Sequence, residues 1–143
     1  MTVLLIVVLL SLAASLYFLY LNIITCENQE CFNRARIDCR RSYFVSESPD
    51  TTLAYTINGK SGDSCAINVK IIQIKRGSAE LATLEGKDMN CNSEYGVLVA
   101  PEKNLEDCHG ILKEDIQNII IKRLHSQIVQ NLGQISEEAT KII

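Results

Sequence analysis

The chain has 143 residues, with 14 basic and 17 acidic side chains and a formal net charge of −3. Nucleic-acid-binding domains usually carry a basic excess gathered into a patch, so this balance argues against that class and we expect no nucleic-acid partner. With 2 Pro, 7 Gly and no Trp, the composition is typical of an ordinary folded domain and not of a disordered linker.

The amino-terminal segment is apolar: the first 25 residues carry no charged side chain. A transmembrane helix needs roughly 20 predominantly apolar residues, so we predict a transmembrane or anchor helix over residues 1–25 of a single-pass membrane protein. Tyr17, Phe18 and Tyr20 cluster near its far end, as interfacial aromatic residues do. The partners predicted for residues 2–25 are membrane lipid or other copies of the same segment.

Two other fates of this segment remain open. Cleavage near Ala13 and Ala14, after a short apolar region, would release a small secreted binding module. Residues 23–26 (IITC) resemble a bacterial lipobox, in which Cys26 would carry the lipid. Lipidation of Cys26 would leave an odd number of cysteines for pairing.

Six cysteines follow the apolar segment. Their even number, placed after a membrane or export signal, favours disulfides and therefore a domain outside the cytoplasm. The alternatives are reduced core residues in a cytoplasmic domain, or a zinc site, which the absence of any C-x-x-C pair disfavours. Six cysteines allow 15 pairings. The disulfide candidates are Cys26, Cys31, Cys39, Cys65, Cys91 and Cys108.

Four arginines argue for the opposite topology. The positive-inside rule would place them, and with them the domain, in the cytoplasm. We give the cysteines more weight because the arginines begin several residues past the apolar segment and alternate with acids. As a group they form either a solvated helix face or a contact with lipid headgroups. They are Arg34, Arg36, Arg40 and Arg41.

The residues after the anchor predict a helical extension over 26–45. Cys31, Ala35 and Cys39 recur every four residues and so share one helical face. Because no Gly or Pro separates this stretch from the anchor, one continuous helix from about Thr2 to Tyr43 is expected. An extracytoplasmic α+β domain is predicted over 46–143.

Alternating apolar residues predict the strands. Leu53, Tyr55 and Ile57 mark the first, and the run from Cys65 to Ile71 marks the second. A less regular strand over 81–91 and a short one over 95–100 would complete an antiparallel sheet of about four strands.

Turn positions set the expected pairing of the strands. A hairpin about Gly77 would bring Cys65 close to Cys91, so this pair is our best single disulfide prediction. Gly59, Lys60 and Ser61 resemble the end of a phosphate-binding loop. Ala54 stands where that motif requires glycine, so we interpret the run as a hairpin turn.

A carboxy-terminal helix is predicted over 105–132, packed on the sheet. Asn104 would cap its start and Gly133 would end it, with Ser136 capping a short final helix. Its apolar sector is wider than one sheet face covers, so either another part of the chain or a partner protein covers the second side. The partner-contact candidates are Ile121, Leu124, Ile128, Val129 and Leu132.

No catalytic signature stands out in the sequence. Cys108 and His109 are neighbours, but a nucleophile and its base are assembled in space, and Cys108 also fits a disulfide. We therefore expect no catalytic residue, no metal site, no cofactor and no enzymatic activity.

The order of elements, with an apolar helix over residues 2–25 followed by an antiparallel sheet, resembles that of type IV pilin-like proteins. The resemblance covers the layout of residues 1–100. In that family a charged leader is removed and the apolar helix packs in a filament core. The bacterial members usually carry Glu at the fifth mature position, where this chain has Leu5.

These observations predict a non-enzymatic, membrane-anchored extracytoplasmic structural or protein-interaction domain stabilised by disulfides. The alternatives are a pilin-like filament subunit assembled through its N-terminal helix, and a small secreted binding module.

Overall fold

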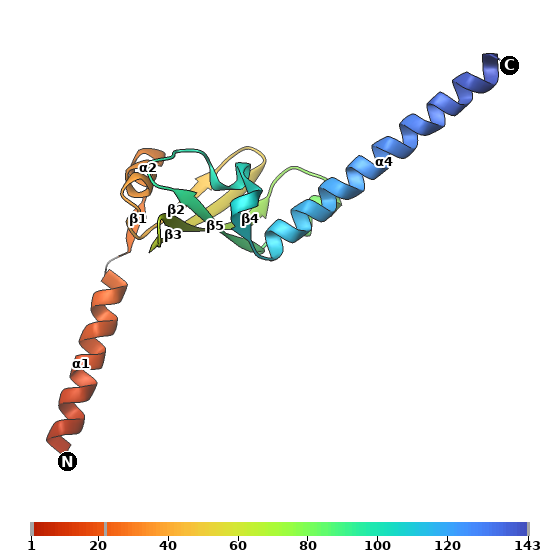
Figure 1. Cartoon of the computed structure of the whole chain (residues 1–143). Helices are drawn as coiled ribbons and strands as arrows, with labels where there is room; N and C mark the ends of the chain where they lie inside the picture. The colour runs from red at the N-terminus through yellow and green to blue at the C-terminus, as the bar shows by residue number, and fades with distance from the viewer. Residues whose placement is uncertain (1, 22, 143) are drawn as a thin grey trace.

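A computed structural model describes residues 2–21 and 23–142, with side chains at 5–17 and 23–132. It is an α+β structure in which a sheet lies between two projecting helices (Figure 1). The helices are α1 (Thr2–Leu21), α2 (Gln29–Ile37), α3 (Ala79–Ala82) and α4 (Ile111–Ile142), with short 3-10 turns η1 (Pro101–Lys103) and η2 (Leu105–Asp107). The strands are β1 (Ile24–Cys26), β2 (Ser42–Glu47), β3 (Thr51–Ser61), β4 (Ser64–Ile74), β5 (Asp88–Glu94) and β6 (Cys108–His109).

The sheet has six strands in the order β1-β2-β3-β4-β5-β6 and is mixed. β1 pairs in parallel with β2, with Ile24 opposite Ser42, whereas every other neighbouring pair is antiparallel. The prediction of an antiparallel sheet of about four strands is therefore wrong. The two strands that it missed, β1 and β6, are only three and two residues long, too short for an alternating pattern.

The predicted second strand and first hairpin are confirmed, but the third and fourth strands are misplaced. β3 and β4 turn at Gly62, as the sequence indicates. The segment after Gly77 forms α3, and the next strand begins only at Asp88. Residues 95–100, predicted as a strand, form a loop instead.

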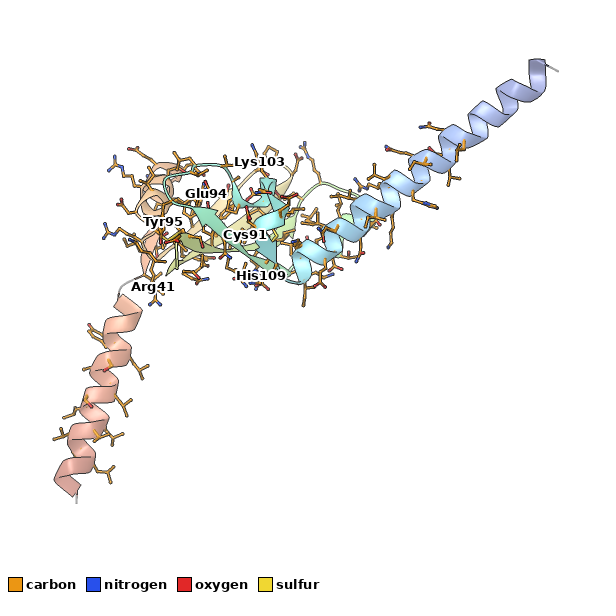
Figure 2. All side chains as sticks on the ribbon, viewed as in Figure 1. Arg41, Cys91, Glu94, Tyr95, Lys103 and His109 are labelled. Carbon is orange, nitrogen blue, oxygen red and sulfur yellow. A yellow bond between two sulfur atoms is a disulfide. The ribbon has the colours of Figure 1, made fainter. Side chains whose placement is uncertain are left out.

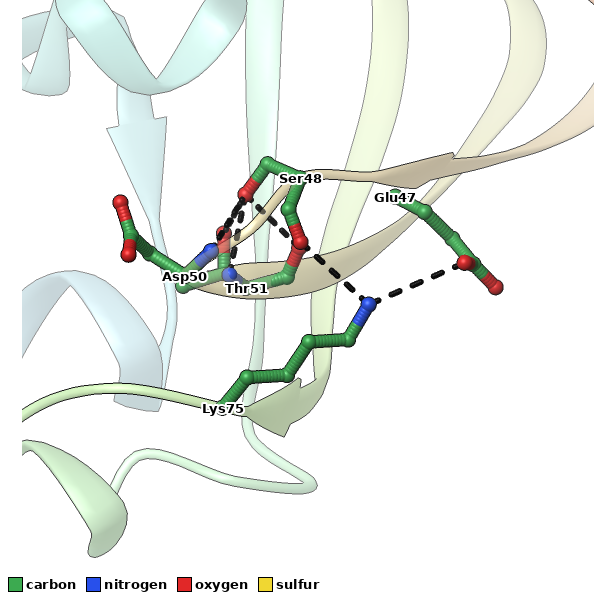
Figure 3. Close-up of polar contacts among 5 residues, drawn as sticks. All are labelled: Glu47, Ser48, Asp50, Thr51 and Lys75. Atoms are coloured by element: carbon green, nitrogen blue, oxygen red, sulfur yellow. Dashed lines mark hydrogen bonds and ion pairs between the residues drawn. The ribbon is translucent and has the colours of Figure 1, made fainter.

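The turn between β2 and β3 is held by Ser48. Its hydroxyl accepts hydrogen bonds from the backbone N–H of Thr51 at 2.9 Å and of Asp50 at 3.3 Å. Lys75, at the end of β4, donates to the Ser48 carbonyl at 3.3 Å and lies 3.7 Å from the Glu47 carboxylate (Figure 3). A serine at a turn satisfies backbone groups that the sheet leaves free, which fixes this hairpin.

One continuous helix from Thr2 to Tyr43 is a wrong prediction, because β1 separates two helices. Asn28 caps the start of α2, its side chain accepting from the N–H of Cys31 at 2.9 Å. Of the helical extension predicted over 26–45, only the nine residues of α2 are helical, and the stretch from Ser42 onward is strand.

The predicted single-pass membrane localisation is also wrong. Within the described part of the chain, no helix combines the length and the apolar character needed to cross a bilayer.

The core lies between α2, the sheet and the base of α4. Phe32 on α2 stacks on Phe44 with ring centroids 4.9 Å apart, and it packs against the tilted ring of Tyr55 with centroids 5.2 Å apart. Ile57, Ile67, Val69 and Met89 from three adjacent strands are each 1% exposed. Burying an aromatic cluster against branched aliphatic side chains stabilises the domain by about 1.5–3 kcal/mol per large side chain.

All six cysteines are paired, which confirms a disulfide-stabilised domain. The bonds join Cys26 to Cys31, Cys39 to Cys65, and Cys91 to Cys108. The predicted pair Cys65–Cys91 is wrong, since the register places Ser93 opposite Cys65 and Ile67 opposite Cys91. The prediction placed the third strand too early in the chain, and this shifted the register.

Gly110 lets β6 join α4 beside β5. It has φ +125°, and a Cβ atom there would lie 3.1 Å from both the Asp88 carbonyl oxygen and the Met89 Cα. We expect Gly110→Ala to lower the free energy of unfolding by about 2–3 kcal/mol, through backbone strain and overpacking together. Gly62→Ala is the control, because Gly62 also has positive φ but open space around it. If urea unfolding showed the same loss of unfolding free energy for Gly110→Ala and Gly62→Ala, the role given to the space around Gly110 would be wrong.

Candidate interaction surfaces

The base of α4 is fixed to the sheet by its first three turns. Leu112 and Ile119 are buried, and Lys87 forms an ion pair with Asp115 at 2.7 Å. Lys113 donates to the Cys108 carbonyl at 2.7 Å. Beyond Ile119 the helix leaves the sheet (Figure 1), and Arg123 on its next turn still lies 3.9 Å from the Glu80 carboxylate of α3. The carboxy-terminal helix predicted over 105–132 is present, but only its base packs on the sheet. It also starts later, at Ile111, and runs through Gly133 without the predicted stop.

The partner-contact candidates predicted from the sequence all lie on the projecting part of α4. Each side chain is 53–63% exposed, and none is among the buried residues of the core. They are Ile121, Leu124, Ile128, Val129 and Leu132.

These apolar residues face away from the domain. Nine residues, about two and a half helical turns, separate Leu112 from Ile121 and likewise Ile119 from Ile128. The first member of each pair packs on the domain, so the second lies on the opposite side of the helix. The domain itself cannot cover that side, and an exposed contiguous apolar stripe of this kind is typical of an interaction surface.

A second feature is a buried arginine that holds a surface loop. Arg36, on the inner side of α2, is 5% exposed. Its guanidinium donates to the carbonyl oxygens of Val97, of Leu98 at 3.4 Å and of Val99. Burial lowers the pKa of Arg36, and the nearby negative charge of Glu102 opposes that shift. The sequence interpretation of the arginines as a solvated face or headgroup contact does not hold for Arg36.

Tyr55 and Glu102 complete this buried polar cluster. The Tyr55 hydroxyl donates to a carboxylate oxygen of Glu102 at 2.8 Å. Burial raises the pKa of Tyr55, and the charge and hydrogen bond of Glu102 raise it further. The cluster thus keeps Tyr55 neutral and ties the loop after β5 to both α2 and β3.

The raised pKa of Tyr55 predicts alkaline sensitivity. An unfolded tyrosine ionises near pH 10, while folded Tyr55 keeps its proton to higher pH, so the folded state binds more protons there. Stability contributed by neutral Tyr55 is present below pH ~10 and is lost as pH rises above it. Thermal unfolding midpoints should therefore fall less steeply above pH ~10 in Tyr55→Phe than in the wild type. Tyr43→Phe, at an exposed position, is the control; an identical slope in all three proteins would contradict the prediction.

The third feature is a cavity of about 270 Å³ between the outer edge of β5 and the loop that returns to β6. Figure 2 shows Cys91 and Glu94 on this strand, with Tyr95 where the loop begins. The walls combine apolar side chains with two carboxylates. The lining residues are Cys91, Asn92, Ser93, Glu94, Val97, Val99, Ala100, Pro101, Asn104 and Asp107.

The residues considered for catalysis do not form a reactive site. Cys108 is bonded to Cys91 and is buried, so it provides no nucleophile beside His109. Gly59 and Lys60 lie within the β3 ladder and Ser61 at its end, as the hairpin interpretation expects. Among the described residues, no group of three or more His, Cys, Asp or Glu side chains is placed to hold a metal ion.

Comparisons with protein-family models, with curated proteins and with solved structures find no match to this chain. The surfaces above are therefore interpreted from their own geometry. Sequence reasoning found the α4 face through its helical periodicity but missed the cavity and the Arg36 cluster. The signal for the cluster would have been the burial of Arg36. The sequence does not indicate that burial, because Arg36 lies in a strongly charged run.

Proposed function

We propose that this chain is a non-enzymatic, extracytoplasmic protein-interaction domain that presents α4 to another protein. The observation that carries the proposal is the apolar face of α4, from Ile121 to Leu132, which points away from the hydrophobic core formed by the described residues. Burying such a face against a partner removes apolar surface from water at about 25 cal/mol per Å². A helix segment this far from the domain gains most of its stability from such packing.

Three disulfides support the extracytoplasmic part of the proposal. Disulfides persist in oxidising compartments and are rare in the cytosol of most organisms. With all six cysteines paired, the domain has the covalent constraint typical of small exported proteins.

The test compares Ile128→Asp with Gln130→Asp. Both add one carboxylate to exposed helix, but Gln130 lies on the side that continues the domain-packing stripe of Leu112, about five turns away. Each protein is purified from its own source and its mass is measured by native mass spectrometry. The wild type and Gln130→Asp should appear as a complex with a partner protein. Ile128→Asp should appear as the isolated chain. A wild type that is already alone would contradict the proposal.

A second candidate, the pilin-like filament subunit, is favoured by α1. Its side chains from Leu5 to Tyr17 are all exposed, and nearly all of them are apolar. Packing of this helix against copies of itself would bury it. Sedimentable fibres that survive Ile128→Asp but are lost in Leu9→Lys would support this candidate over the first.

A further inference from the structure

The apolar positions on the projecting part of α4 are spaced symmetrically about Ile128. Leu124 and Leu132 lie four residues before and after it. The sequence places Ile121 and Ile135 seven residues before and after it. At 3.6 residues per turn, all five positions lie within roughly 40° of Ile128 around the helix axis. They form one stripe whose spacing is the same in both chain directions, and the side chains described at Ile121, Leu124, Ile128 and Leu132 are 53–63% exposed.

A stripe of this kind matches a second copy of itself that runs in the opposite direction. When two α4 helices lie side by side with Ile128 at the centre, Ile128 meets its own copy. Leu124 then meets Leu132 of the second copy, because each is four residues from the centre. Every apolar position faces another apolar position, which is the self-complementary contact of a twofold dimer. An unrelated partner would not require this symmetry.

Charge decides the direction of the pair, because a parallel pair would also match the apolar positions. Lys122 and Arg123 precede Ile128, whereas the acids that follow it in the helix sequence are Glu137 and Glu138. An antiparallel pair sets the basic segment of each helix beside the acidic end of the other. A parallel pair would set both basic segments at the same level. Charge patterns of this sort fix the orientation of paired helices.

The base of α4 leaves room for the second helix. The end of α4 in the second copy, at Ile142, would lie level with Glu114, because both are 14 residues from Ile128. Glu114 and Gln117 are exposed and lie within roughly 40° of Ile128 around the axis, on the side opposite the buried Ile119. A second helix centred on Ile128 therefore lies along exposed helix over its whole length and leaves the contact between α4 and the sheet intact.

We propose that the partner of the α4 face is a second copy of this chain, whose α4 packs antiparallel to the first about a twofold axis beside Ile128. The inference rests on the proposed function, since it names the partner of the same face. The two domains then lie on opposite sides of the helix pair, with the two copies of Ile119 about 27 Å apart along its axis. The dimer is thus a rod that presents one disulfide-stabilised domain towards each end.

The test cross-links the full chain through single cysteines introduced on α4. The reagent is a bismaleimide that spans about 8–10 Å, the distance between the axes of packed helices. All six native cysteines are paired and do not react with it. Ile128→Cys should give a covalent dimer. Leu124→Cys alone should not, because its two copies are about 12 Å apart along the axis. An equimolar mixture of Leu124→Cys and Leu132→Cys should give the dimer.

Gln130→Cys is the matched control, because it lies on the other side of the same helix and should give no dimer. Adding Ile128→Asp to both members of the mixture sets two carboxylates side by side at the centre. It should lower the yield of covalent dimer by about tenfold or more.

Two results would overturn the inference. A dimer formed by Leu124→Cys alone would show that the helices are parallel. Ile128→Cys that stays monomeric would show that the partner is not a second copy. If native mass spectrometry then showed a complex with a different protein that is lost in Ile128→Asp, this inference would fail while the proposed function stands. If no complex of either kind formed, both would fail.

Discussion

Removing the disulfide between Cys39 and Cys65 is expected to lower the free energy of unfolding by about 3–4 kcal/mol. The bond closes a sequence separation of 26 residues and joins the segment just after α2 to the start of β4. Both cysteines are buried, at 5% and 1% exposure, so the double alanine variant also leaves space in the core. A loss of this size is a large fraction of the stability of a small domain.

The matched control is removal of the disulfide between Cys26 and Cys31. Its separation is only 5 residues, so the loop-closure term predicts a smaller loss, about 2 kcal/mol. Urea unfolding of Cys39→Ala/Cys65→Ala and of Cys26→Ala/Cys31→Ala measures both. If the loss of Cys26–Cys31 lowered the free energy of unfolding more than the loss of Cys39–Cys65, the role assigned to Cys39–Cys65 in holding α2 on the sheet would be wrong.

The second large effect is expected for Arg36→Met, which should lower the free energy of unfolding by about 2–3 kcal/mol. Methionine keeps the apolar stem packed near Phe32 but removes the guanidinium that donates to Val97, Leu98 and Val99. Hydrogen bonds from a charged donor contribute about 1.5–3 kcal/mol. The carboxylate of Glu102 also loses the nearby positive charge that favours it in this partly buried position.

Arg34→Met is the control for Arg36→Met, because Arg34 lies on the exposed side of the same helix and pairs with Glu30 at the surface. Its expected cost is about 0.5 kcal/mol or less. Hydrogen exchange should accelerate over residues 97–100 in Arg36→Met alone. Comparable unfolding free energies for the two variants would show that Arg36 does not hold the loop.

Local sequence patterns correctly predicted those elements whose conformation follows from the alternation of apolar and polar residues, such as β3. The alternation of Leu53, Tyr55 and Ile57 reports a half-buried strand because its period matches the pleat. The same rule failed for 95–100, whose apolar run looks like a strand. Gly96 has φ +74° and breaks the extended conformation, and Arg36, distant in sequence, takes the carbonyls that a neighbouring strand would otherwise bond.

Contacts between distant residues account for the rest of what sequence analysis missed. The parallel pairing of β1 with β2 depends on α2 returning the chain, and no local feature of Ile24 to Cys26 reports it. Helical periodicity predicted a wide apolar sector on α4, whereas the orientation of that sector opposite the domain follows from where Leu112 and Ile119 pack. The cavity beside Asn92 lies between β5 and residues 97–107, and no local pattern reports how that loop folds back on the strand.

The central claim, a disulfide-stabilised domain outside the cytoplasm, is tested most directly by the intact mass of the natively produced protein. The protein is alkylated with and without prior reduction. The account predicts no alkyl group on the unreduced protein and six on the reduced protein, one for each cysteine. Alkylation of the cysteines without reduction would contradict the three disulfides, and with them the proposed location of the domain.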